Sequence, residues 1–190
     1  MHLYSKKIVI TGGPSTGKTS VIEKLETLGY TCLPEVIRAM TLEKKESEEA
    51  VSFKSNPIIS VADPMAFNSS ILNARIAQYN ATLQSTESLF FFDRGIPDVL
   101  AYMDCFKQKY GDNFTTACAK HPYDLVFLMP PWKEIHRTDN ERFESFEESL
   151  LVHECLQNTY RQLGYAVITV HQDTIDNRVK FILEKIKSLK

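Results

Sequence analysis

Residues 7–20 read KIVITGGPSTGKTS, in which an apolar, β-branched run leads into a glycine-rich turn that contains a lysine. The run at 7–11 predicts a buried strand. Residues 17–28 predict a helix, because apolar side chains recur on one helical stripe and a glycine follows. Between them, residues 12–19 fit GxxxxGK[ST], the phosphate-binding loop (P-loop), in the strand–loop–helix context that it requires.

Each part of this loop has a physical reason to bind phosphate. Glycine lets the backbone bend around a phosphate without a Cβ in the way, and successive N–H groups at a helix N-terminus present positive potential to it. Lys18 is expected to reach the β- and γ-phosphates of ATP, and the Thr19 hydroxyl to ligate Mg²⁺. The alternative is a glycine-rich turn that holds no ligand. The predicted nucleotide-binding residues are Gly12, Gly13, Pro14, Ser15, Thr16, Gly17, Lys18, Thr19 and Ser20.

Composition narrows the class of protein. The 190 residues are 43% hydrophobic and 24% charged, which is typical of one globular domain spanning 1–190. A net charge of −2 argues against a dedicated nucleic-acid binder, and no apolar stretch is long enough for a membrane span. The four cysteines lack zinc spacing, the histidines lack metal-binding spacing, and the charged N-terminus does not resemble a secretory signal. We expect a cytoplasmic protein with a small-molecule substrate.

The rest of the chain alternates short apolar runs with helical patterns, which predicts an α/β fold with a five-stranded parallel sheet between helical layers. Further strands are expected at 30–33, 89–92, 124–129 and 165–170, and helices after 63, from 97, near 143–163 and at 174–188. No linker divides the chain, and residues 41–62 give no clear pattern.

Asp93 and Arg94 directly follow the apolar strand at 89–92. Ligands of open α/β sheets bind at the carboxyl ends of the strands, so this acid is placed to organise Mg²⁺ together with Thr19. Arg94 is placed to meet phosphate. The alternative for Asp93 is a cap on the next helix.

Glu35 ends the second predicted strand, and Arg38 follows three residues later. A carboxylate there could accept a proton from a substrate hydroxyl, and the arginine could hold an anionic substrate; a solvated pair at a helix start is the alternative. Helices within 41–85 would form the acceptor side of the site, where Arg75 could meet an acceptor phosphate.

Arg137 and Arg142 lie in RTDNER, after the fourth predicted strand. Mobile arginines that close over the transferred phosphate would form a lid at about 133–142. An ordinary charged loop explains the same residues.

Four segments together, GGPSTGKT, PEVIR, FFDRGIPDVLAY and MPPWKEIHRTDNERF, resemble the NadR-like AAA-domain family of small P-loop ATPases. This family is related to nucleoside and nucleotide kinases, and ribosylnicotinamide kinase is its best-known activity. The resemblance implies a kinase-like core with sheet order 2-3-1-4-5, ATP and Mg²⁺ on the P-loop, and an arginine-bearing lid. It does not transfer a substrate.

Other P-loop classes lack their motifs here. The sequence has no [NT]KxD or DxxG for a Ras-like GTPase and no LSGGQ for an ABC ATPase, and its length leaves little room for the helical lid domain of a AAA+ motor. Two hypotheses remain: a kinase that phosphorylates a small metabolite, such as a nucleoside or nucleotide, with Mg-ATP, and a nucleotide-dependent binding or regulatory module with weak ATPase activity.

Overall fold

The computed structural model describes residues 5–37, 63–136 and 145–188. Its strands are β1 (Lys6–Gly12), β2 (Thr31–Leu33), β3 (Leu89–Asp93), β4 (Leu125–Met129) and β5 (Val167–Thr169). Its helices are α1 (Lys18–Thr27), α4 (Pro64–Thr82), α5 (Pro97–Cys105), α6 (Asp112–Lys120), the 3₁₀ turn η1 (Lys133–Ile135), α7 (Phe146–Gln162) and α8 (Ile175–Ser188). The strands pair in parallel in the order β2-β3-β1-β4-β5. The predicted fold class and strand order are confirmed.

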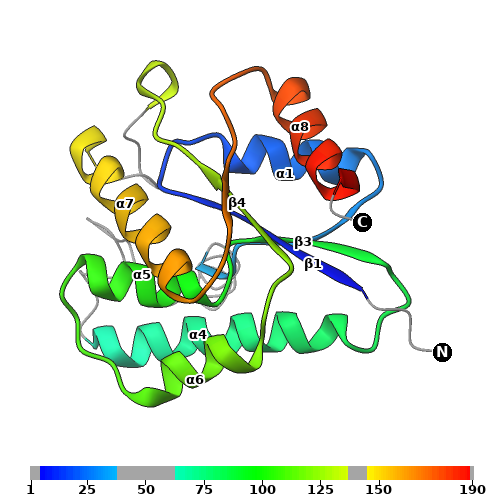
Figure 1. Cartoon of the computed structure of the whole chain (residues 1–190). Helices are drawn as coiled ribbons and strands as arrows, with labels where there is room; N and C mark the ends of the chain where they lie inside the picture. The colour runs from blue at the N-terminus through cyan, green and yellow to red at the C-terminus, as the bar shows by residue number, and fades with distance from the viewer. Residues whose placement is uncertain (1–4, 38–62, 137–144, 189–190) are drawn as a thin grey trace, which may run out of the picture.

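Alternate residues of the central strands supply two hydrophobic cores. Val9, Phe92 and Leu128 face a cluster built with α4, α5, α6 and α7. Ile10 and Phe91 face the opposite cluster, built with α1 and α8. Figure 1 shows the sheet between these two sets of helices. A parallel sheet covered on both faces explains why its strands are continuous apolar runs in the sequence.

The sequence did not predict α6. Its buried residues Phe114, Ala117 and Cys118 follow helical spacing, but two of the three are small, so the apolar periodicity is weak in the sequence. By contrast, α7 begins one residue after Ser145, whose side chain and that of Glu148 form a reciprocal capping box.

This topology brings the carboxyl ends of β1, β2 and β3 together. Asp93 is the register partner of Ile10, and Leu33 is the partner of Phe92. The P-loop and the residues that follow β2 and β3 therefore share one edge of the sheet. None of the four cysteines forms a disulfide. Among the described helices, none is both long and apolar enough to cross a membrane.

Candidate functional site

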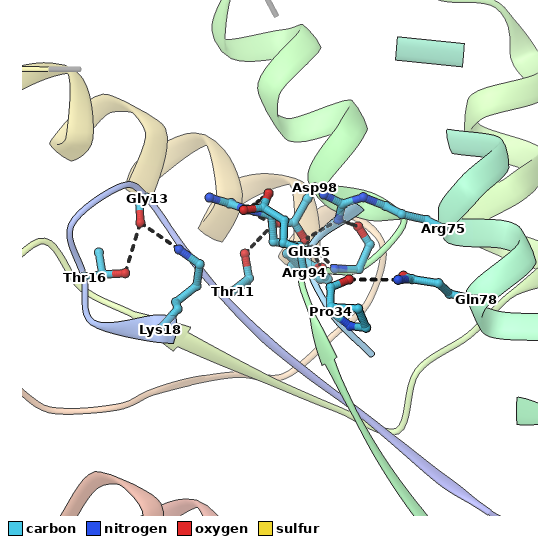
Figure 2. Close-up of polar contacts among 12 residues, drawn as sticks. Thr11, Gly13, Thr16, Lys18, Pro34, Glu35, Arg75, Gln78, Arg94 and Asp98 are labelled. Carbon is cyan, nitrogen blue, oxygen red and sulfur yellow. Dashed lines mark hydrogen bonds and ion pairs between the residues drawn. The ribbon is translucent and has the colours of Figure 1, made fainter. Parts of the chain in front are cut away.

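The P-loop connects β1 to α1, and two of its own side chains donate hydrogen bonds to its backbone. Lys18 Nζ and Thr16 Oγ1 each donate a hydrogen bond to the carbonyl oxygen of Gly13, both at 3.0 Å (Figure 2). The backbone also passes close to β4, since a Cβ on Gly12 would lie 2.6 Å from the carbonyl oxygen of Met129. Glycine at position 12 is therefore a requirement of packing as well as of the loop's shape.

Lys18 is a buried cation, with 8% of its surface exposed. Burial, together with the neighbouring charge of Arg94, lowers its pKa to about 8, while the charges of Asp93 and Glu35 oppose the shift. An anion at the loop would raise this pKa again, because it favours the ammonium form.

Asp93 is also buried, and its Oδ1 atom has no hydrogen-bond partner. Burial raises the pKa of this carboxyl group. The positive charge of Lys18 is the largest effect that opposes this rise. Asp93 does not cap the next helix, because α5 begins at Pro97 with Ile96 at its N-cap. An unpartnered buried oxygen beside a P-loop is open to a cation or a donor from a ligand.

Arg94 follows Asp93 in a left-handed conformation, with φ of 73°. Its Nε donates to Glu35 Oε1 at 3.0 Å (Figure 2), and its guanidinium lies 5.2 Å from the centre of the Tyr102 ring. The predicted base Glu35 and the predicted phosphate ligand Arg94 are thus brought together as an ion pair.

Asp98, which sequence reasoning did not single out, lies at the centre of this site with 1% of its surface exposed. Its carboxylate accepts hydrogen bonds from the Thr11 and Tyr160 hydroxyls, both at 2.5 Å, and from the Gly95 N–H at 2.9 Å. Its Oδ1 also lies 3.4 Å from Nη1 of Arg94. No helical spacing rule indicates this pairing in the sequence, because Arg94 lies outside α5 in a left-handed conformation.

Arg75 joins the same cluster from α4. Its Nη1 donates to the Gly95 carbonyl and lies 3.9 Å from Asp98 Oδ2, while its Nε has no hydrogen-bond partner. Nearby, Gln78 donates to the carbonyl of Pro34 at 2.8 Å, which ties α4 to the end of β2 (Figure 2).

The remaining predicted residues are placed less fully. Thr19 and Ser20 lie half-buried in the first turn of α1. Arg38, Arg137 and Arg142 lie outside the described residues, as do positions 137–142 of the predicted lid and positions 41–62 of the predicted acceptor side. Within the described ranges, no group of three or more histidine, cysteine or acidic residues could hold a metal ion.

The sequence matches the model of a family described as an AAA domain over residues 7–178. The chain belongs to this AAA-domain family. No curated protein matches the sequence.

Several solved structures share the fold. A NadR protein in complex with NR superposes with a TM-score of 0.71 at 17% identity, over 97% of this chain and 49% of that chain. The chain therefore spans about half the length of that NadR structure. A thymidylate kinase from Candida albicans has a TM-score of 0.68 at 18% identity, with 97% of this chain and 92% of that chain covered.

A deoxyadenosine kinase from M. mycoides has a TM-score of 0.63 at 17% identity, with coverages of 97% and 100%. At these identities the likeness shows the fold, which is that of P-loop kinases. The family match and the fold confirm the NadR-like resemblance that the sequence motifs suggested.

The lowered pKa of Lys18 predicts a pH dependence of stability. Between pH about 8 and 10.5 the unfolded chain binds a proton at Lys18 that the folded protein has lost, so the free energy of unfolding rises with pH in that window. The rise attributable to Lys18 is at most about 3 kcal/mol. Urea denaturation gives the free energy of unfolding of the wild-type protein and of Lys18→Met. We expect the wild-type value minus the variant value to increase across this pH range.

The matched control is Lys24→Met, which removes a more exposed lysine of the same helix. The profile of this variant gives the baseline for the loss of a lysine from α1. A profile for Lys18→Met that is no steeper than this baseline would contradict the lowered pKa of Lys18.

The buried carboxylate of Asp98 predicts a large cost for removing its charge. Asp98→Asn leaves Arg75 and Arg94 without their shared buried anion, and removing one partner of a buried ion pair costs about 3–5 kcal/mol. Denaturant unfolding should show this loss. Asp104→Asn, an exposed position of the same helix, should change the free energy of unfolding by less than about 0.5 kcal/mol. Equal stability of the two variants would contradict the account.

Proposed function

We propose that this protein is a kinase that transfers a phosphoryl group from Mg-ATP to a small metabolite, such as a nucleoside or nucleotide. The observation that carries the proposal is the buried Asp93 carboxylate, whose Oδ1 has no hydrogen-bond partner, at the sheet edge shared with Lys18 and Arg94. Phosphoryl transfer relies on positioning and on cations around the phosphates, and this edge holds both cations and an acid suited to a metal ion.

The residues present fit a magnesium ion. Asp93 offers an unpartnered carboxylate oxygen, and Thr19 offers a hydroxyl in the first turn of α1. Mg²⁺ prefers oxygen ligands and is commonly held by one or two protein groups together with substrate phosphates. When bound, the ion would neutralise negative charge on the phosphates.

Each protein group at this edge of the sheet would have a distinct role in phosphoryl transfer. The N–H groups of residues 12–19 would hold the phosphate chain, and Lys18 would leave the Gly13 carbonyl to contact the β- and γ-phosphates. Arg94 would stabilise charge on the transferred group. Glu35 is the proposed base for the acceptor hydroxyl, with Arg94 holding its carboxylate in place at 3.0 Å.

Neighbouring folds support a nucleoside-type acceptor without identifying it. The similar structures include a NadR protein in complex with NR, a deoxyadenosine kinase and thymidylate kinases. We therefore propose nucleosides, nucleotides and nicotinamide riboside as the first acceptors to test.

A second function is favoured by one contact. Glu35 is already ion-paired with Arg94, which stabilises the carboxylate and weakens it as a base. A nucleotide-dependent binding module with weak ATPase activity would keep this pair and show little transfer.

The test is a panel of candidate acceptors with Mg-ATP, scored first by thermal shift and then by formation of the phosphorylated acceptor. We expect saturable transfer to at least one acceptor. Asp93→Asn should lower turnover by on the order of 100-fold while it changes the affinity for ATP far less, because Asp93 acts on the metal ion and the transferred charge.

Asp104→Asn serves as the control for loss of an exposed carboxylate and should retain full turnover. Tight ATP binding with negligible transfer to every acceptor would favour the binding module. Wild-type turnover in Asp93→Asn at limiting magnesium would overturn the proposed role of Asp93.

A further inference from the structure

Arg178 approaches the P-loop from α8, on the far side of the sheet from Asp98. Its side chain is buried, with 3% of its surface exposed, and Nη2 donates a hydrogen bond to the carbonyl oxygen of Thr16 at 2.8 Å. The same nitrogen contacts the sulfur of Met129 at the end of β4, and the guanidinium lies 5.8 Å from the centre of the Trp132 ring. Three separate contacts fix this cation behind the loop.

Among the residues that the structure describes, no carboxylate lies beside the charge of Arg178. In the described part of the chain, no acidic oxygen lies within 4.0 Å of its guanidinium, and its Nε has no hydrogen-bond partner. Burial lowers the pKa of Arg178, and the more distant negative charge of Asp173 partly opposes this lowering. Because a buried cation is costly without a counter-charge, a phosphate chain on the loop would supply what the protein alone lacks.

The hydrogen bond to Thr16 also sets the direction of the next N–H group. A trans peptide is planar, with its C=O and N–H pointing in opposite directions. Holding the Thr16 oxygen toward Arg178 therefore turns the Gly17 N–H away from α8, toward the side of the loop where P-loop N–H groups face phosphate. Gly17 itself has φ of 78°, and a Cβ there would lie 2.7 Å from Arg178 Nη1, so the guanidinium in its present position packs directly against a glycine.

We infer that Arg178 is a positioning residue for phosphate binding: it orients the Thr16–Gly17 peptide and places a second positive charge behind the loop. This inference rests on the proposed binding of a nucleotide at the P-loop. Arg178 acts through the loop backbone on the phosphate chain, and it makes no contribution to recognition of the base.

The test compares Arg178→Met and Arg178→Lys with wild type, using calorimetric titration with AMP-PNP and with tripolyphosphate, both with magnesium. Tripolyphosphate carries the phosphate chain alone. Loss of a charge-assisted hydrogen bond should weaken binding of both probes by the same factor, about tenfold or more, in Arg178→Met. Arg178→Lys keeps the charge but not the planar fork, so it should lose less affinity for both probes.

The matched control is Lys24→Met, which removes a cation that links α1 to α8 through Asp176, at 2.8 Å, without touching the loop. It should bind both probes as wild type does. Unchanged affinity of folded Arg178→Met, even with a lower melting temperature, would reduce Arg178 to a structural residue and overturn the inference. A loss confined to AMP-PNP would indicate a contact with the base and would also overturn it.

Two further results keep the test decisive. If Arg178→Met does not fold, unchanged affinity of Arg178→Lys for both probes overturns the inference and a matched loss supports it. If the wild-type protein binds neither probe, both the proposed nucleotide site and this inference are wrong. If the Arg178 variants bind both probes as tightly as wild type does, only this inference is wrong.

Discussion

The carboxylate of Asp98 is the constraint on which the site depends. A buried anion must have its hydrogen-bonding capacity met, and here the partners come from β1, the β3–α5 connection and α7. The requirement therefore fixes these elements relative to one another. It also fixes the guanidinium groups of Arg94, which follows β3, and of Arg75, which lies on α4. In the proposed function, the cations that would face a substrate are thus held in place by the packing of the domain.

Among the described residues, the positive and negative side chains at this edge are equal in number. Three cationic side chains, Lys18, Arg75 and Arg94, stand with three acidic ones, Glu35, Asp93 and Asp98. A triphosphate adds several negative charges to this balance. In the proposed function these charges are met by protonation of Lys18, by a metal ion at the unpartnered oxygen of Asp93, and by Arg178 behind the loop. In the proposed function, the lowered pKa of Lys18 and the unpartnered oxygen of Asp93 mark where a phosphate and a metal ion would bind.

Local patterns were enough to predict the P-loop, the five strands and the placement of Asp93 and Arg94, because a strand end in a parallel sheet points to the ligand edge. The strand order came from the family resemblance. The contacts of Asp98 and Arg178 could not be predicted, because their partners lie 87 and 162 residues away in the chain. The pairing of Glu35 with Arg94 spans 59 residues and depends in the same way on β2 lying beside β3. Sequence chemistry predicted candidate site residues but not Asp98 or Arg178, whereas tertiary packing decided which residues touch.

The most direct measurement is calorimetric titration of the protein with magnesium AMP-PNP in buffers of different ionisation enthalpy. Bound phosphates should raise the pKa of Lys18 from about 8 toward its ordinary value. Binding at pH about 9 should therefore take up roughly one proton per site, and binding at pH about 7 almost none from this group. Lys18→Met should lack the uptake. A binding heat at pH about 9 that does not depend on the buffer would contradict the claim that the phosphates of a nucleotide bind beside the buried Lys18. Proton uptake that persists in Lys18→Met would contradict it too.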